Sequence, residues 1–359
     1  MSEKVFRILA INPGSTSTKA SVFDNSKEIA GLTVRHDHQQ LAGFNTILEQ
    51  KQLRTDDIIK MLKDNDIPLE SLDAVSGRGG VIKPMDSGTY TINERMIEDL
   101  HTETAMTHAS CLGGIIAGEI GKKQNIPAFI VDPVVVDELE PPARLTGFPE
   151  IRRTSIFHAL NSKAVARRLA GQMGVRYEDS RFIVAHMGGG ITVSAHRNGR
   201  AVDVNNGITG EGPFTPERSG AAPLRQIIEM CFSGAYTKAE LMSKVLGKGG
   251  MSAHLGTSDM QAAEEMIRNG DANAAMVVDA MAYQVAKEIG AMAAVLEGRI
   301  DAIILTGGLA HSDSFVQKII TRVDRFAPVH LFPGEGEMPA LAEGALRVLR
   351  GETPAMTYK

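Results

Sequence analysis

Three apolar runs along the chain each end in a turn rich in glycine and small polar side chains. The first run, Ile8–Ile11, leads into the segment 12–19; the second, Phe182–Met187, leads into three glycines; the third, Ala302–Leu305, leads into a Thr-Gly-Gly turn. Short apolar runs bounded by turn residues are typical of buried strands. Because glycine has no Cβ, its backbone N–H groups can approach an anion closely. The pattern therefore predicts three buried strands whose ends can hold phosphate groups.

Apolar periodicity predicts that strands and helices alternate in both halves of the chain. In the first half we expect a hairpin over 5–23, a helix over 55–65, a strand from Ala74, a helix over 102–122 and a strand over 128–132. In the second half we expect a helix over 155–173, a hairpin over 182–196, helices over 222–232 and 271–297, a strand over 302–305 and a last helix over 339–349. This outline predicts an α/β fold.

The two halves follow the same outline of hairpin, glycine turn and alternating helices and strands, which is compatible with a duplicated domain. The segment Pro141–Pro149 is rich in proline and lacks apolar periodicity, so the break between domains is expected there. The sequence therefore predicts a first domain over residues 1–150 and a second over residues 151–336.

Composition restricts the class of protein. Hydrophobic residues make up 43% and charged residues 23%, as in ordinary globular proteins, and the net charge of −5 without a basic block argues against a nucleic-acid partner. No 18-residue apolar stretch predicts a membrane span, and no signal-like segment is visible, so we expect a cytoplasmic protein. The two cysteines, Cys111 and Cys231, are expected to be buried free thiols.

The first glycine turn carries the groups of a phosphate-binding loop. Asn12, Ser15, Ser17 and Lys19 offer an amide, two hydroxyls and an ammonium within one turn. The spacing of a Walker A loop, G-x-x-x-x-G-K-[ST], is absent. A hairpin turn stabilised by its own serine and threonine side chains explains the same residues equally well.

Two arginines in glycine-containing loops are candidates for binding an anion. Arg78 lies in the segment Gly77–Gly80, and Arg218 lies in Phe214–Gly220. A guanidinium group matches carboxylate and phosphoryl oxygens with two parallel donors. The alternative for each is an ordinary surface arginine, since charged side chains are mostly exposed.

Histidines and carboxylates supply further candidates. His158 opens an apolar helix, and His186 precedes the triple glycine; either could instead be a hydrogen-bonded structural histidine. Asp132 ends a buried strand, where α/β proteins place ligands. Glu337 begins the last helical segment, with Glu335 as its competitor; such separated carboxylates could hold Mg²⁺ together with phosphates and water.

Segment 12–19 resembles the N-terminal signature of the acetate and butyrate kinases, which belong to the superfamily of sugar kinases, heat-shock chaperone ATPases and actin. Further segments resemble motifs of that family in the same order along nearly the whole chain. They are Gly77–Gly80, Val131–Leu139, Ser155–His158, Ala185–Gly190, Phe214–Gly220 and Leu305–Gly308. Pro13, Gly189 and the shorter chain are more similar to the butyrate kinases than to the acetate kinases.

The resemblance implies two ribonuclease H-like domains flanking an ATP cleft, with the C-terminal helix over 337–359 joining the first domain. It implies reversible phosphoryl transfer between ATP and butyrate, by in-line attack of the carboxylate on the γ-phosphate. Other short-chain or branched acids, such as acetate, propionate or isobutyrate, are alternatives, and so is a non-catalytic switch like actin or the chaperones. ATP and Mg²⁺ are the implied cofactors, and a dimer or larger homo-oligomer is the implied assembly.

The resemblance also assigns roles to residues. Those implied in catalysis are Arg78, Asp132, His158 and Arg218. Those implied in binding ATP are Asn12, Ser15, Ser17, Lys19, His186, Gly188, Gly189, Gly190, Thr306, Gly307 and Gly308. Glu337 and Asp132 are the implied metal carboxylates, and Val134–Val136 are expected to line an apolar acyl pocket.

Overall fold

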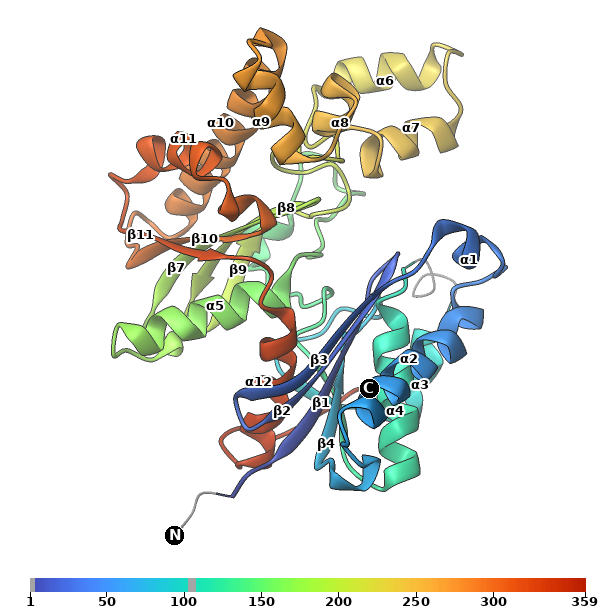
Figure 1. Ribbon diagram of the computed structural model, residues 1–359. Coiled ribbons are helices and arrows are strands. Elements are labelled where there is room, and N and C mark those ends of the chain that lie inside the picture. The colour runs from blue at the N-terminus through green and yellow to red at the C-terminus, as the bar shows by residue number, and fades with distance from the viewer. Residues whose placement is uncertain (1–3, 103–107) are drawn as a thin grey trace. The chain divides into compact units, whose positions relative to one another are not determined.

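The computed structural model describes residues 4–102 and 108–359, which form two compact units (Figure 1). Unit 1 contains the chain up to Val136 together with Gly336–Lys359, and unit 2 contains Asp137–Glu335. Residues 137–150, which we expected to belong with the first half, therefore lie in unit 2.

Polar contacts explain why the segment after Val136 belongs to unit 2. Glu138 forms a buried ion pair with Lys163 at 2.7 Å and accepts a hydrogen bond from the backbone N–H of Ala201 at 2.8 Å. The backbone N–H of Glu140 donates to the carbonyl of Val202 at 2.9 Å. A buried ion pair that loses one partner leaves an uncompensated charge, so these contacts hold the segment firmly.

The described residues of unit 1 form a seven-stranded sheet in the order β12-β5-β6-β4-β1-β2-β3. The strands are β1 (Arg7–Pro13), β2 (Ser17–Asp24), β3 (Lys27–Arg35), β4 (Ala74–Gly77), β5 (Thr89–Thr91), β6 (Ala128–Val131) and β12 (Met356–Thr357). β1 pairs antiparallel with β2 and parallel with β4, which pairs parallel with β6.

The described residues of unit 2 form a five-stranded sheet in the order β11-β10-β7-β8-β9. The strands are β7 (Arg181–Met187), β8 (Ile191–Arg197), β9 (Arg200–Val204), β10 (Ala302–Gly307) and β11 (Val329–Pro333). β7 pairs antiparallel with β8 and parallel with β10, which pairs parallel with β11. The order β9-β8-β7-β10-β11 thus repeats the order β3-β2-β1-β4-β6 of unit 1, strand for strand.

Helices cover both faces of each sheet. Those of unit 1 are α1 (His38–Ala42), α2 (Lys51–Asp64), α3 (Glu94–Leu100), α4 (Cys111–Gln124) and α12 (Glu337–Leu349). Those of unit 2 are α5 (Ala159–Gln172), α6 (Leu224–Phe232), α7 (Lys238–Leu246), α8 (Gly250–Leu255), α9 (Met260–Arg268), α10 (Ala272–Val295) and α11 (Asp313–Val323). In unit 1, α2 and α4 lie on one face of the sheet and α12 on the other (Figure 1).

Alternating side chains of β7 build the two cores of unit 2. Ile183, Ala185 and Met187 pack into the cluster that includes α10 and α11, whereas Phe182 and Val184 pack into the cluster that includes α5. A strand covered on both faces is apolar at most positions, which explains the apolar run Phe182–Ala185 within β7.

Two helices begin later than the sequence predicts. α5 starts at Ala159 rather than near residue 155, because His158 has ψ 58° and lies outside the helical region. α4 starts at Cys111 rather than near residue 102, and part of the expected helix, residues 103–107, lies outside the described residues. His158 consequently lies in the turn before α5.

The two cysteines differ in their surroundings. Cys111 is buried, and burial raises the pKa of its thiol to about 11. Cys231 is exposed, contrary to expectation, because α6 buries none of its residues. Within residues 4–102 and 108–359, no helix has both the length and the apolarity required to cross a membrane.

Gly77→Ala is expected to destabilise the protein by about 1–3 kcal/mol, because a methyl group would overlap the carbonyl of Gly113 on α4. Gly171→Ala is the matched control, since nothing lies within 4 Å of its added methyl group on α5. Urea unfolding checks both variants. Equal stability of the two variants would contradict the close packing at Gly77.

Candidate active site

Two glycine turns of unit 2 lie against each other at the ends of adjacent strands. β7 and β10 run parallel with Thr306 opposite His186. Gly307 has φ +90°, and any side chain there would overlap the backbone of Met187. The turn Gly188–Gly190 is closed by a hydrogen bond from the N–H of Gly188 to the carbonyl of Gly190 at 3.0 Å. Glycine therefore permits the two turns to approach.

A cavity of about 440 Å³ opens beside these turns within unit 2. Gly188, Gly189 and Gly308 line it, together with the segment Ser258–Gln261 at the start of α9. A side chain at Gly308 would meet no other atom within 4 Å, so its backbone borders open space. Bare backbone beside a cavity of this size suits a ligand that carries phosphate groups.

His158 and His186, both selected from the sequence, stack on each other. Their ring centroids lie 3.9 Å apart with an interplanar angle of 9°. His158 Nδ1 lies 2.9 Å from Thr192 Oγ1, and His186 Nδ1 lies 3.2 Å from Asn161 Oδ1. Both imidazoles are thus held in fixed orientations beside the glycine turn.

Asn161 fixes the proton position on His186. Its Nδ2 donates to the backbone carbonyl of Glu335, which orients the amide so that Oδ1 is the acceptor. Oδ1 accepts from Thr306 Oγ1 at 3.2 Å and therefore also from His186 Nδ1. With Nδ1 holding the proton, Nε2 is the acceptor in neutral His186.

The loop that carries Arg218 is tied to the glycine turn by one hydroxyl group. Thr215 Oγ1 donates to the carbonyl of Gly189 at 2.6 Å and accepts from the N–H groups of Glu217 at 3.2 Å and Arg218 at 2.9 Å. A side chain at Gly190 would overlap the Arg218 guanidinium, which therefore lies beside the turn. Burial lowers the pKa of Arg218, although the nearby Glu217 charge acts in the opposite direction.

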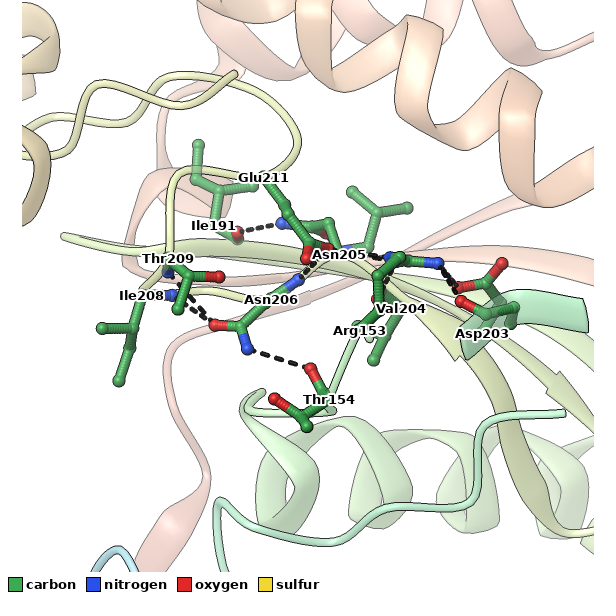
Figure 2. A network of polar contacts seen from close by, with 12 residues as sticks. Arg153, Thr154, Ile191, Asp203, Val204, Asn205, Asn206, Ile208, Thr209 and Glu211 are labelled. Atoms are coloured by element: carbon green, nitrogen blue, oxygen red, sulfur yellow. Dashed lines mark hydrogen bonds and ion pairs between the residues drawn. The ribbon is translucent and has the colours of Figure 1, made fainter. Parts of the chain in front are cut away.

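Arg218 Nη1 donates to the carbonyl of Gly207, which lies in the loop after β9. A network of charged and amide groups holds this loop (Figure 2). Arg153 pairs with Asp203 at 3.0 Å and with Glu211 at 3.1 Å, and Glu211 accepts from the backbone N–H of Asn206 at 3.0 Å. Burial alone would lower the pKa of Arg153, but the two carboxylate charges raise it. This network therefore fixes the loop whose Gly207 carbonyl accepts the hydrogen bond from Arg218.

In unit 1, the structure brings together Asn12, Arg78 and Glu337. Asn12 and Arg78 follow the paired ends of β1 and β4, and Glu337 is the first residue of α12. Asn12 Nδ2 donates to Glu337 Oε2 at 2.5 Å, and Arg78 Nη1 forms an ion pair with Glu337 Oε1. Arg78 Nη1 also lies 3.3 Å from Asn12 Oδ1. An arginine, an amide and a carboxylate thus meet where parallel strands end.

Asp132 is buried at the end of β6 and has φ +36°. Its Oδ1 accepts hydrogen bonds from Ser87 Oγ at 2.5 Å and from the N–H of Gly88 at 2.8 Å. These bonds stabilise the charged carboxylate and hold it in one direction. Asp132 and Glu337 thus have separate protein partners.

The first glycine turn of unit 1 presents Ser15 and Thr16 on its surface. Ser15 Oγ lies 3.3 Å from His108 Nε2, a neighbour that sequence reasoning did not select. The N–H of Gly14 donates to the carbonyl of Ser17 at 2.8 Å, which closes the turn. Lys19 lies on β2 directly opposite Asn12.

Within residues 4–102 and 108–359, no group of three or more His, Cys, Asp or Glu side chains is arranged to hold a metal ion. A magnesium ion commonly takes one or two carboxylates and completes its shell with phosphate oxygens and water. The carboxylates of Asp132 and Glu337 are compatible with that mode, in which the phosphates supply most of the ligands.

Sequence reasoning missed Asn161 and Thr215, which orient His186 and the Arg218 loop. Asn161 lies on the first turn of α5, and its burial, which marks it as a positioning residue, is visible only in the folded structure. Thr215 carries no signal in the sequence either, because a threonine in a loop is ordinary. Only the folded structure shows that its hydroxyl joins two loops.

Comparisons with known proteins identify a family and a fold. A model of the acetokinase family matches residues 142–330. The chain is similar to the crystal structure of Porphyromonas gingivalis acetate kinase, with 20% identity, 96% of this chain and 100% of that chain covered, and a TM-score of 0.79. It is also similar to a Francisella tularensis subsp. tularensis SCHU S4 propionate kinase (16%, 94% and 98%, TM-score 0.77) and to Entamoeba histolytica acetate kinase (18%, 94% and 98%, TM-score 0.73). The predicted fold class is confirmed.

Thr215→Val is expected to destabilise the protein by about 1–3 kcal/mol, because the N–H groups of Glu217 and Arg218 lose their acceptor. Thr215→Ser keeps the hydroxyl group and is the matched control. Hydrogen exchange of these two amides, with thermal unfolding, checks the expectation. If the amides exchange equally fast in the valine and serine variants, the hydroxyl does not hold the loop.

Proposed function

The chain belongs to the acetokinase family of carboxylate kinases, and from this premise we propose that it is a butyrate kinase. It would transfer a phosphoryl group reversibly between ATP and butyrate, giving butyryl phosphate and ADP. The observation that carries the proposal is the cavity of about 440 Å³ in unit 2, bordered by the glycine turns at Gly188–Gly190 and Gly308.

The residues of unit 2 fit a nucleotide. The open backbone at Gly308 and the cavity beside it leave room for the adenosine and its phosphates. We assign the stacked rings of His158, held by Thr192, and His186, held by Asn161, to contact the phosphoryl oxygens; His186 Nε2 can donate to them only when that nitrogen also carries a proton. We assign ATP binding to these groups and to the first glycine turn of unit 1.

In the proposed reaction, a carboxylate oxygen of the acid forms a bond to the γ-phosphorus as the bond to the bridging oxygen of ADP breaks. Both reactants are anions, so catalysis requires cations and fixed dipoles where charge collects. Arg78 and Arg218 are the proposed cations. When bound, Mg²⁺ would neutralise part of the phosphate charge, and we assign Glu337 and Asp132 to hold it, directly or through water.

The choice of butyrate rests on the residues expected to contact the acyl chain, Val134–Val136. Val135 and Val136 are buried, and Val135 packs in the core of unit 1, which leaves Val134 as the partly exposed member of the run. Each buried CH₂ group contributes about 0.8 kcal/mol, so two extra carbons favour butyrate over acetate by about 15-fold.

The proposed enzyme is a homo-oligomer, a dimer or larger. Support comes from α6, whose Leu224, Ile228 and Phe232 are 65%, 55% and 86% exposed. Apolar side chains gathered on one exposed helix are typical of a surface that contacts another protein.

With ATP and Mg²⁺, the protein is expected to form an acyl phosphate from butyrate, trapped as the hydroxamate. A panel of acetate, propionate, butyrate and isobutyrate tests the acid, and kcat/KM should be highest for butyrate, by about 15-fold over acetate. A higher kcat/KM for another acid would move the assignment to that acid. Absence of any hydroxamate from folded protein that binds ATP would favour the non-catalytic switch.

Arg218→Ala is expected to lower kcat by about 10²–10³-fold with little change in ATP affinity, because one donor to the developing charge is lost. Arg78→Ala should behave alike. Arg176→Ala in unit 2 is the control, since Arg176 is exposed and pairs with Asp179. Intact kcat with a collapse of ATP affinity would make both arginines nucleotide anchors instead.

A further inference from the structure

A fully buried arginine lies behind the first glycine turn of unit 1. Arg54 on α2 is 0% exposed and is the largest of the fully buried side chains among the described residues. Its side chain reaches from the helix to the turn between β1 and β2.

The guanidinium of Arg54 bonds mainly to the turn itself. Nη1 donates to the carbonyl of Ser17 at 2.6 Å and to Thr18 Oγ1 at 3.2 Å, and Nη2 donates to the carbonyl of Ser15 at 3.3 Å. Nη2 also donates at 2.9 Å to Oε1 of Gln50, the residue that directly precedes α2. The planar guanidinium group thus donates from two nitrogens to two carbonyls of one turn. The single nitrogen of a lysine ammonium group cannot reproduce this geometry.

The positive charge of Arg54 has no carboxylate in contact with it. Within residues 4–102 and 108–359, no Asp or Glu lies within 4.0 Å of its guanidinium, and Nε has no hydrogen-bond partner. Burial lowers the pKa of Arg54, while the more distant charge of Asp57 opposes that effect. A guanidinium group nevertheless remains charged in proteins. The interior behind the turn therefore holds a cation that no carboxylate of the described residues contacts directly.

The same bonds determine which way the peptide groups of the turn face. In a trans peptide the carbonyl of one residue and the N–H of the next point in opposite directions. Since the carbonyl of Ser15 points to Arg54, the N–H of Thr16 points away from it. The carbonyl of Thr16 is itself occupied by the N–H of His36 at 2.9 Å. The turn therefore keeps its carbonyls toward protein donors and presents the N–H of the exposed Thr16 outward.

We propose that Arg54 is a positioning residue for phosphate binding: it holds the turn at residues 14–18 with an N–H group facing outward and adds positive charge directly behind it. This proposal rests on the proposed function, since it requires the phosphates of a nucleotide at this turn. An anion bound outside the turn compensates a charge that no carboxylate of the described chain contacts. Arg54 itself is buried and does not touch the ligand.

The test compares ADP with adenosine as probes, by titration calorimetry in the presence of Mg²⁺. Adenosine lacks phosphates and reports on the cavity of unit 2, whereas ADP also reports on the phosphate sites. Arg54→Met removes the charge and the guanidinium group, and Arg54→Lys keeps the charge alone. Ile58→Ala is the matched control, because Ile58 is 0% exposed one turn further along α2 and packs in the apolar core of unit 1.

We expect Arg54→Met to raise the Kd of ADP by at least about tenfold while the Kd of adenosine changes less than about twofold. Arg54→Lys should lie between the wild type and the methionine variant. Ile58→Ala should lower Tm without changing either Kd, because it weakens the core and leaves the turn alone.

An unchanged ratio of the two Kd values in both Arg54 variants overturns the proposal, and so does an equal loss of affinity for ADP and adenosine, which indicates a purely structural role. If the methionine variant fails to fold, the lysine variant decides alone, and an unchanged ratio there overturns the proposal. Failure of the proposed function is recognised separately: wild-type protein that binds ADP would then form no acyl phosphate from any acid.

Discussion

Direct contact between backbones, with no side chain between them, fixes the position of the candidate active-site groups in both units. In unit 2, Gly307 lies against the backbone of Met187, and this brings Thr306 level with His186. In unit 1, Gly77 lies against Gly113 of α4, and this determines where Arg78 leaves β4. A methyl group added at either glycine would push the two backbones apart, and the hydrogen bonds between them would become too long.

The candidate charged groups are held by partners within their own unit before any substrate is present. Arg78 pairs with Glu337, Arg218 donates to Gly207, and Asp132 accepts from Ser87. Such bonds keep a side chain in one rotamer and so reduce the ordering required when a ligand binds. Pre-positioned dipoles and cations are also what phosphoryl transfer requires, because the protein contributes mainly geometry and charge.

The local part of this arrangement could be predicted from the sequence. The strands around the glycine turns, and the choice of Arg78, Arg218, His158 and His186 as candidates, follow from short segments of neighbouring residues. Contacts between distant residues could not be predicted from periodicity: Asn12 and Glu337 are separated by 325 positions.

The late start of α5 has a physical reason. Apolar periodicity continues through the turn that precedes this helix, although His158 has left the helical region of backbone conformation. The burial of Arg54 could not be predicted from the sequence either, because an arginine on a helix is usually exposed. Its full burial depends on the turn between β1 and β2, which supplies the carbonyls that replace water.

The chain leaves unit 1 at Val136 and returns to it only at Gly336, after the whole of unit 2. During synthesis unit 2 is complete and continuous while unit 1 still lacks α12, so the order of assembly follows the order of translation. Until α12 emerges, the buried face of the unit 1 sheet that receives it remains uncovered, and Arg78 lacks its carboxylate partner. Residues that are translated after the whole of unit 2 therefore complete the domain that began to form first.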